Sequence, residues 1–524
     1  MVPSLLTLHV FAILQVSTAF RLPTVPAKAT PVRAASSAAV SVSLGGVTYV
    51  NQGLVGFGRI ASNFTESTGD TLGGIGSAIA IKPGTWQALS NGSFTGTLVV
   101  QPDRGFNVIS TIDYQARRHE LDFVLTPYYD SADLTFAAAQ KTFALTYKDT
   151  VLEVERNNTK TSGLDPSAIR AAMSGAGTKP LADPQMPIAS TAEPHLSVDA
   201  EGLVANADGT YWTSDEYGPY IYLFSADGHL IQTIQPPQAI LPFDSKGNLN
   251  FTANVDPATG RGANQGLEGL TLDPTTNTLY AILQSATIQD GALQYTRLLA
   301  YDVSQPSVSV PLVGGMGSPA PVEQQRQGRG DDEGVFLCLA RDGNGHGGSG
   351  DKIKYKHADL FSIANATDIH GTAFDSPSTP VAPKGKLSKT ITPATYVSFV
   401  DYADATQLAR FGLHNGALLI FIVQISILLE SIVLTPNSWV TGDPDDNTLL
   451  DAKWESLALA PVGDSSAPDD FFLFTASDND FLSTQGVSLG VPYNAGEDVD
   501  NQFLVFRVTL PGASANVKKA LGLC

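Results

Sequence analysis

The sequence predicts an all-β protein in which short antiparallel strands form a β-propeller. Glycine and proline are abundant, with 48 Gly and 32 Pro in 524 residues, and only 16% of the residues are charged. This balance disfavours long exposed helices and favours many strands joined by tight turns. One strand–turn–strand unit also recurs along the chain, which is typical of radial or stacked β architectures. A β-sandwich is the alternative, because it is built from similar hairpins.

Each full copy of the unit begins with Glu, passes through an apolar strand and a turn, and ends in a second apolar strand. Full copies span 201–216, 268–283 and 455–480, and partial copies span 76–105 and 334–342. The turns contain Gly, Asn and Asp, which tolerate the positive φ angles of tight hairpins. A single hairpin cannot bury both of its faces, so the copies must pack against one another.

Other segments complete the expected pattern of elements. Apolar runs predict strands at 121–125, 221–224, 297–303 and 503–510. The best candidate for a short helix is 165–174, where Pro166 suits the first helical position. The charged run 117–120 is interpreted as an exposed strand end.

The ends of the repeated hairpins are expected to meet. In an antiparallel pair the start of one strand lies beside the end of its partner. The expected neighbours are Glu201 with Asp215 and Glu216, and Glu455 with Asp478 and Asp480. If all hairpins point the same way, these carboxylates gather on one acidic rim.

The N-terminus predicts a secreted, extracellular protein. Residues 1–19 are interpreted as a signal peptide, with an apolar stretch from Leu5 to Val16 and small residues before the cut. That stretch is shorter than the ~20 residues of a membrane span. Residues 20–41 are a linker or propeptide, and one β domain occupies 42–524 with its core at about 74–510. Predicted N-glycosylation sites are Asn63, Asn91, Asn157, Asn250 and Asn365.

Cysteine content and charge limit the partners. Only Cys338 and Cys524 occur, so a disulfide framework is not expected and Cys338 is interpreted as a buried small hydrophobe. The net charge of −20 disfavours nucleic acid and anionic membranes and favours cations. We expect a monomer that acts on a small phosphorylated or ester substrate.

The apolar segment 417–434 breaks the repeat. Three interpretations remain open: a short membrane helix carrying an internal Glu430, a buried strand pair or helix, or an insertion foreign to the fold at about 416–441.

The candidate chemistry rests on carboxylates. There is no G-x-x-x-x-G-K-[ST], H-E-x-x-H, paired C-x-x-C or G-x-S-x-G motif. Clustered carboxylates without thiols or histidine pairs suit hard cations, with Ca²⁺ as the expected cofactor. The predicted metal ligands are Glu201, Asp215, Glu268, Glu455, Asp478 and Asp480, and the predicted catalytic residues are Glu201, Asp215, Glu216 and Glu268. For any one of these residues, turn chemistry is the alternative.

A glycine-rich loop, RDGNGHG at 341–347, supplies further polar groups after an apolar strand. It is not an EF-hand loop, because Ile353 stands where the closing Glu would fall. The expected substrate-binding residues are Arg104, Arg341, Asn344 and His346.

Several runs resemble the phytase-like domain family, labelled esterase-like activity of phytase, and its secreted fungal members. These runs are EGLVANADGTYWTSDEYGPYIYLFSADG, NQGLEGLTLDPTTNTLYAILQS, RDGNGHG, KWESLALAPV and DYQARRHELDFVLTP. The resemblance spans about 74–510 and implies a β-propeller-like domain linked to phosphoric-ester or carboxyl-ester hydrolysis. Family members are expected to run from ARFGLHNG almost directly into LLDAKWESLAL, so 416–441 is extra.

Two functional hypotheses follow. The first is a metal-assisted phosphoric-ester hydrolase with its site on an acidic rim. The alternative is a non-enzymatic extracellular propeller that binds a ligand or cell-wall partner and uses calcium structurally.

Overall fold

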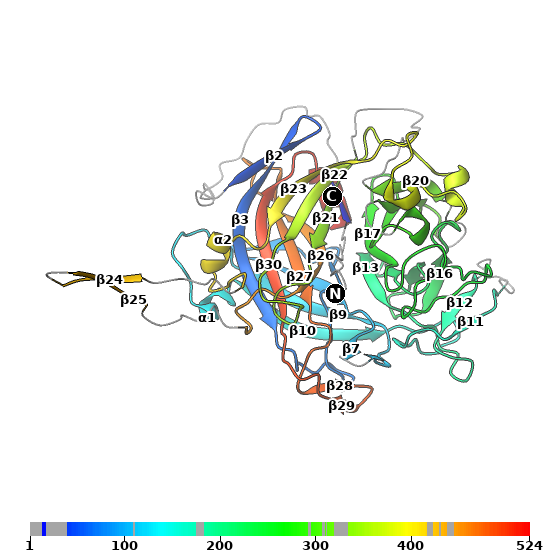
Figure 1. Cartoon of the computed structure of the whole chain (residues 1–524), viewed down its shortest axis with the longest axis horizontal. Helices are drawn as coiled ribbons and strands as arrows, with labels where there is room; N and C mark the ends of the chain where they lie inside the picture. The colour runs from blue at the N-terminus through cyan, green and yellow to red at the C-terminus, as the bar shows by residue number, and fades with distance from the viewer. Residues whose placement is uncertain are drawn as a thin grey trace.

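Five antiparallel sheets surround a common axis as the blades of a β-propeller, which confirms the predicted fold class (Figure 1). The structure is a computed structural model. It describes residues 39–107, 110–173, 183–291, 295–306, 310, 312–318, 334–416, 423–428, 431–436 and 445–523, together with 13–16.

Each sheet runs from an innermost strand at the axis to an outer strand at the rim. The first contains, in that order, β4 (Ala78–Ile81), β6 (Phe94–Gln101), β9 (Arg117–Leu125) and β10 (Phe143–Leu152), with β5 (Gln87–Ala88) on β6. The second contains β13 (Ala200–Ala205), β14 (Tyr211–Asp215), β15 (Ile221–Phe224) and β16 (Leu230–Ile234). The third contains β17 (Leu267–Asp273), β18 (Thr278–Leu283), β19 (Thr296–Asp302) and β20 (Leu312–Ser318). The fourth contains β1 (Ile13–Val16), β21 (Val335–Arg341), β22 (Lys356–Ser362) and β23 (Thr395–Asp401). The fifth contains β26 (Lys453–Pro461), β27 (Asp470–Asp478), β30 (Asn501–Thr509), β3 (Val47–Ile60) and β2 (Val40–Leu44).

The fifth sheet joins the two ends of the described domain. Its inner strands β26, β27 and β30 come from the C-terminal part of the chain, and its outer strands β3 and β2 come from the N-terminal part. The blue β3 and red β30 therefore lie side by side in Figure 1, paired antiparallel along their length. This pairing joins the N-terminal and C-terminal parts of the described domain with backbone hydrogen bonds and so closes the ring.

The innermost strands form the wall of the propeller axis. β4 contacts β13 and β26, β13 contacts β17, and β21 contacts β26. β1 pairs with β21 and contacts β17, so it occupies the innermost position of the fourth sheet. The predicted signal peptide 1–19 includes β1 and otherwise lies outside the described residues. Removal of that peptide would make β21 the innermost strand of this sheet.

Smaller elements connect the sheets. Three short strand pairs are β7 (Phe106–Asn107) with β8 (Ser110–Thr111), β11 (Ala168–Arg170) with β12 (Met186–Ile188), and β28 (Gly486–Ser488) with β29 (Val491–Tyr493). The α-helices are α1 (Phe136–Ala139), α2 (Ala405–Ala409) and α3 (Ser514–Ala520). The 3₁₀ turns are η1 (Ile288–Asp290), η2 (Ala373–Asp375) and η3 (Pro383–Gly385).

Two local predictions are wrong. The helix expected at 165–174 is replaced by β11, because a ten-residue helix is marginal alone and pairing with β12 competes with it. The run 117–120, expected to be an exposed strand end, is buried in β9. β9 pairs with β6 on one side and β10 on the other, so its charged residues have buried partners instead of water.

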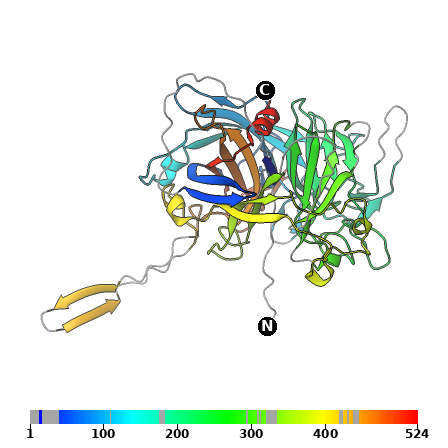
Figure 2. The ribbon, with the colours of Figure 1, turned by 90° about the horizontal axis from the view of Figure 1, so that it is seen from above.

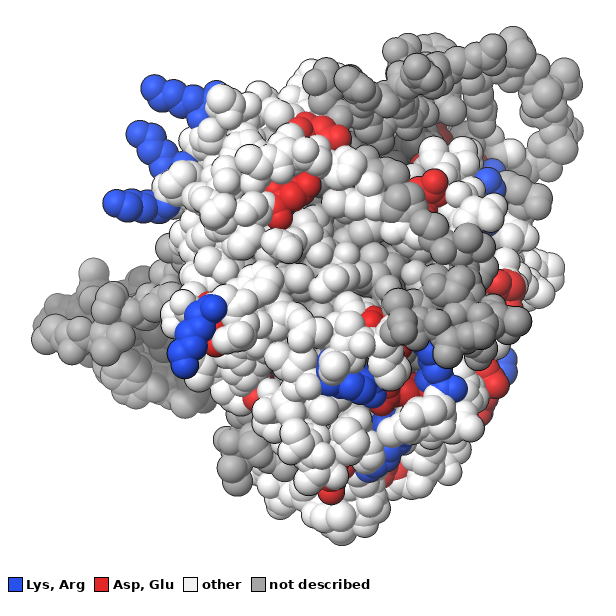
Figure 3. Space-filling view, turned by 90° about the vertical axis from the view of Figure 1, so that its right-hand side faces the viewer, with Lys and Arg blue, Asp and Glu red and all other residues white. Residues whose placement is uncertain are grey.

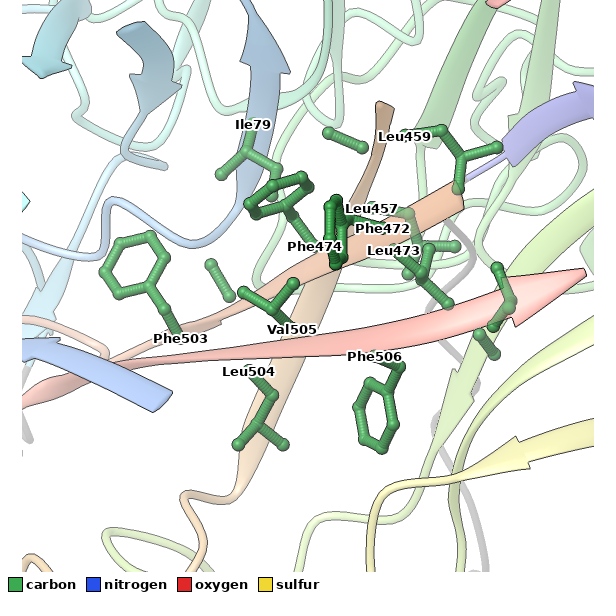
Figure 4. Close-up of a cluster of buried hydrophobic side chains, with 14 of the residues drawn as sticks. Ile79, Leu457, Leu459, Phe472, Leu473, Phe474, Phe503, Leu504, Val505 and Phe506 are labelled. Atoms are coloured by element: carbon green, nitrogen blue, oxygen red, sulfur yellow. The ribbon is translucent and has the colours of Figure 1, made fainter. Parts of the chain in front are cut away.

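The core is continuous through the fifth sheet. Every residue of β27 is buried, and Phe474 packs with Phe123 and Phe143 across to the first sheet. Figure 4 shows Phe503 and Val505 on one side of β30 and Leu504 and Phe506 on the other. Strands with both faces buried read as continuous apolar runs, which is why these segments were predictable. Cys338 is also buried, with a free thiol, as predicted.

Residues 423–428 and 431–434 of the apolar segment 417–434 lie in a separate hairpin. β24 (Val423–Leu428) pairs only with β25 (Ser431–Pro436), and the hairpin stands away from the body in Figures 1 and 2. In the part of the chain that the structure describes, no helix has the length and apolar character needed to span a membrane. The arrangement fits an insertion foreign to the propeller, since His414 bridges directly to Leu449 beyond it.

Deleting 417–441 should therefore leave the propeller intact. We expect the thermal unfolding midpoint to change by less than about 2 °C, because the hairpin adds no strand to any blade. Circular dichroism melting curves would measure this. The matched control removes 486–493, a hairpin whose Val487 carbonyl accepts from Thr71 N at 2.9 Å and which should be needed for stability. A large loss of stability on deleting 417–441 would contradict the insertion interpretation.

Candidate functional site: a buried carboxylate cluster

Three β-bulges hold the leading glutamates of the repeated units. In β13, Ala200 pairs with Asp215 and Gly202 with Ser214, so Glu201 is the extra residue. The same irregularity leaves Glu268 unpaired in β17 and Glu455 unpaired in β26. A bulge re-aims a side chain and often occurs next to a functional site. Here all three bulges lie on innermost strands.

Carboxylates from several sheets converge at these bulges. Oxygen atoms of Glu201, Glu216 and Glu268 lie within 4.8 Å of one another, and all three residues are buried. Two further groups with the same spacing share members with one another: Asp103, Asp199 and Glu201, and Asp103, Asp478 and Asp480. We call Asp103, Asp199, Glu201, Glu216, Glu268, Glu455, Asp478 and Asp480 the carboxylate cluster.

Three basic side chains contact the cluster. Lys453 Nζ lies 2.9 Å from Asp480, 3.6 Å from Glu455 and 3.8 Å from Asp103, and it also donates to Asp478. Arg341 donates to Glu455 at 2.6 Å, and Arg104 to Asp199 at 2.9 Å. The acidic groups outnumber these bases. The cluster reaches solvent at Asp480, whose side chain is 37% exposed, and is otherwise mostly buried.

Burial shifts the protonation of the cluster. Burial, followed by the charge of Glu455, raises the pKa of Glu268 to about 8. Burial and then Glu268 hold the pKa values of Glu201 and Glu216 well above their usual range. Burial would lower the pKa of Lys453, but Asp478, Asp480 and its other carboxylate neighbours raise it well above its usual value. Lys453 is therefore a fixed positive charge within the cluster.

Several buried carboxylate oxygens have no hydrogen-bond partner. They are both Oε atoms of Glu216, Oε2 of Glu201 and Oε2 of Glu455. Glu268 is held by Gln284, which donates to its Oε1. A buried polar atom without a partner costs about 1–3 kcal/mol, and more when charged. Glu201, Glu216 and Glu268 each offer an oxygen within 4.8 Å of the others. A cation, an ordered water or a proton shared between Glu216 and Glu268 would satisfy this arrangement.

Comparisons with known proteins decide the family. Residues 84–396 match the phytase-like family described as esterase-like activity of phytase. The chain belongs to the phytase-like family. A relative from Arthroderma benhamiae, named only as an uncharacterized secreted protein, is 33% identical over 493 residues, covering 85% of this chain and 90% of that protein.

Solved structures are more distant. A luciferin-regenerating enzyme covers 87% of this phytase-like chain and 98% of its own at 11% identity, with a TM-score of 0.25. The PQQ-bound aldose sugar dehydrogenase of Streptomyces coelicolor covers 59% and 94% at 14% identity, with a TM-score of 0.19. Structural similarity with such low TM-scores and sequence identities gives no information about function.

Asp215 of this phytase-like protein has a local role. Its carboxylate accepts hydrogen bonds from the backbone amides of Asp199, Tyr217 and Gly218 at 2.9–3.1 Å, and from the Tyr222 hydroxyl at 3.0 Å. Four donors occupy both oxygens, so Asp215 shapes the turn that carries Glu216. This geometry favours the turn interpretation at this position over the ligand interpretation.

Asn344 and His346 belong to a separate group. Asn344 donates to Asp342 at 3.1 Å, and the nitrogens of His346 contact Asp445 Oδ1 at 2.8 Å and the Asp498 carbonyl at 3.2 Å. Burial opposes protonation of His346, but the hydrogen bond to Asp445 raises its pKa. Among the described residues, neither side chain shares a hydrogen bond with the carboxylate cluster. Of the glycine-rich loop, only Arg341 reaches the cluster.

Two cluster residues, Asp103 and Asp199, were not predicted, and neither was Lys453, which contacts the cluster. Asp199 and Lys453 stand two positions before Glu201 and Glu455, at the same place in the repeat. Side chains two apart on a strand share a face, so this spacing could have identified both. Asp103 lies after the end of β6 and not beside a leading Glu of the repeat, so the repeat does not identify it.

The outer surface shows other features. On the face in Figure 3 acidic and basic side chains are scattered among uncharged residues. The sequon residues Asn63, Asn91, Asn157 and Asn365 are exposed and Asn250 is half-buried, so all five fit the predicted glycosylation. A shallow pocket of about 490 Å³ contains no cluster residue and is lined by Gln235, Pro236, Pro237, Gln238, Leu312, His370, Thr372, Asp375 and Ser376. We place the chemistry at the cluster because the titratable groups converge there.

Proposed function

We propose that this phytase-like protein is secreted and hydrolyses small phosphoric esters at the carboxylate cluster with the help of a divalent cation. The observation that carries the proposal is the convergence of Glu201, Glu216 and Glu268, buried and within 4.8 Å of one another. Turn formation does not require the bulge residues Glu201 and Glu268 of two blades to bring their carboxylates together with Glu216, whereas a shared ligand set does.

The donor set fits a hard cation such as Ca²⁺. All the ligands are carboxylates, and the residues described around them contribute no thiol or imidazole. The unpartnered oxygens of Glu201 and Glu216 would become ligands. Lys453 already fills the group of Asp103, Asp478 and Asp480 with its own positive charge. Arg104 likewise pairs with Asp199 of the group formed by Asp103, Asp199 and Glu201. The carboxylates of Glu201, Glu216 and Glu268 form no ion pair with a Lys or Arg among the described residues, so this group is the proposed cation position.

The residues around this position have distinct roles in the proposal. Unpaired carboxylates repel the negative charge of a phosphate ester. A bound cation would supply the positive charge that holds a phosphoryl oxygen, and it would lower the pKa of a bound water. Burial raises the pKa of Glu268 to about 8 without a cation, and in its ionised form Glu268 would be the general base toward that water. Arg341 and Arg104 each retain an unpartnered buried Nε–H that would donate to the phosphoryl group.

Glu268→Gln tests the assignment. The substitution preserves the shape of the side chain but removes its charge and its basicity. We expect Ca²⁺ affinity to fall at least about tenfold and turnover of phytate or an aryl phosphate to fall by about 10²-fold or more. Calorimetry and phosphate release, each with and without chelator, measure the two effects.

Glu153→Gln is the matched control. Glu153 is also fully buried, with a pKa raised to about 8 by burial, but it donates no oxygen to the carboxylate cluster and is held by Gln101 at 2.8 Å. Its substitution should leave Ca²⁺ affinity and turnover near the wild-type values. If Glu268→Gln behaves like Glu153→Gln in both measurements, the site assignment is wrong.

A second function is favoured by the burial of the site. Glu201, Glu216 and Glu268 are each at most 8% exposed, which also suits a structural calcium in a propeller that only binds a ligand. Loss of thermal stability on chelation, with no turnover of any ester by the calcium-loaded protein, would select this alternative.

We also propose that the protein is extracellular and monomeric. Its secreted relative supports the extracellular location.

A further inference from the structure

We propose that Ser398, His357 and Asp401 form a second site, independent of the carboxylate cluster, in which Ser398 is a nucleophile toward small carboxyl esters. The three residues lie on β22 and β23, the outer strands of the fourth sheet. The register of this pair shifts between Ala358 and Leu360, so Ser398 lies at a bulge in β23. Bulges next to active sites re-aim side chains, as at the three glutamates.

The three side chains lie in series, joined by one hydrogen bond and one longer ion-pair contact. Ser398 Oγ lies 2.7 Å from His357 Nδ1, and His357 Nε2 lies 3.5 Å from Asp401 Oδ1. When the hydroxyl donates to Nδ1, the imidazole proton is on Nε2 and faces Asp401. This is the nucleophile–base–carboxylate order of a serine hydrolase, and such sites are recognised by geometry and role rather than by sequence position. Contacts of this kind are often long before substrate binds.

The neighbouring groups hold the base in place and leave the nucleophile accessible. The His357 ring stacks on Tyr355 with centroids 4.0 Å apart and planes 3° apart. Buried Asp359 accepts from Tyr355 at 2.6 Å and from Phe399 N at 3.1 Å, and it also accepts from Tyr396. The His357 side chain is 17% exposed, whereas Ser398 is exposed. Ser398 Oγ can also donate to Asp359 Oδ1 at 3.1 Å, and His357 Nδ1 lies 3.5 Å from the same oxygen. Activation therefore requires the hydroxyl to donate to His357, its shorter contact at 2.7 Å, instead of to Asp359.

The proposed reaction is acyl transfer. Ser398 Oγ forms a bond to the ester carbonyl carbon while its proton moves to His357 Nδ1. The bond from that carbon to the alkoxy oxygen then breaks, and His357 returns the proton to the departing alcohol. Water hydrolyses the acyl-serine by the same path and restores the serine hydroxyl. The Tyr355 hydroxyl lies 3.1 Å from Ser398 Oγ but donates to Asp359, so it would donate to the oxyanion only after leaving that carboxylate.

A fluorophosphonate probe tests the nucleophile directly. Attack by Ser398 forms a P–O bond, releases fluoride and gives the serine proton to His357. We expect wild-type protein to be labelled in the presence of chelator, with the adduct on the peptide that contains Ser398. Ser398→Ala should abolish labelling, and His357→Gln should slow it by about 10²-fold or more, the usual contribution of a general base.

Ser388→Ala is the matched control, since Ser388 has a hydroxyl partner, Thr390 at 2.9 Å, but no imidazole beside it. It should be labelled at the wild-type rate. Unlabelled wild-type protein, or an adduct that persists in Ser398→Ala, would overturn the proposal. Because labelling requires no cation, failure here is distinguishable from failure at the carboxylate cluster.

Discussion

Removing divalent cations should make the protein less stable near pH 8 than near pH 5, and adding Ca²⁺ should reduce this difference. The pKa values of Glu201 and Glu216 are raised well above their usual range, and burial raises that of Glu268 to about 8. Between the unfolded pKa of a glutamate, about 4.5, and these raised values, the folded protein binds more protons than the unfolded chain. Its free energy of unfolding then falls as the pH rises.

The size of the effect follows from the number of groups. For each additional proton that the folded protein binds relative to the unfolded chain, the free energy of unfolding falls by about 1.4 kcal/mol per pH unit. Three glutamates of the cluster titrate in this pH range. A bound cation stabilises the ionised carboxylates, and at about 1,000 times its Kd it adds about 4 kcal/mol. Thermal melts of metal-free protein near pH 5 and pH 8, with and without Ca²⁺, measure both contributions.

Two features of the result identify its origin. Burial also raises the pKa values of Glu153, Asp215 and Asp451, which lie outside the carboxylate cluster, to about 8, 7 and 7, so part of the slope with pH should persist when Ca²⁺ is present. Glu216→Gln should lose most of the Ca²⁺ effect. Stability that is indifferent to Ca²⁺ at both pH values would exclude a cation at Glu201, Glu216 and Glu268.

Arg117→Met should destabilise the fold by about 3–5 kcal/mol or more, because it leaves two buried carboxylates unpaired. Arg117 is 1% exposed and contacts Glu66 at 2.8 Å and Asp70 at 3.0 Å. Its guanidinium also lies 3.8 Å from the centre of the Tyr114 ring. Methionine preserves much of the side-chain volume, so the expected loss comes from the charges rather than from a cavity. Urea unfolding would measure the change in free energy.

Lys148→Met is the control for an exposed ion pair. Lys148 is 46% exposed and lies 3.6 Å from Glu120 and 3.4 Å from Asp122, on the strand paired with that of Arg117. Its loss should change the free energy of unfolding by less than about 1 kcal/mol, since water already solvates both partners. Equal effects of the two substitutions would show that the contacts of Arg117 add nothing to stability.

Part of the carboxylate cluster could be predicted because it rests on local rules. The leading Glu and the acidic end of the next strand are joined by a short hairpin, and antiparallel pairing brings them together. The structure accordingly places Glu201 beside Glu216 and Glu455 beside Lys453 and Asp478. The functional role of each residue could not be read in the same way. Asp215 and Glu216 are adjacent in sequence, yet only Glu216 has unpartnered oxygens.

The sequence by itself determined the strands, their turns, the repeat and the identity of the glutamates that begin it, because alternation and turn chemistry act over a few residues. Only the tertiary structure decided which side chains share a site. The three bulges depend on how each strand pairs with its neighbour, and the contacts of Lys453 with Asp103 and of His357 with Ser398 join residues far apart in the chain. Burial then raises the pKa values at the cluster, and burial depends on the packing of all five sheets.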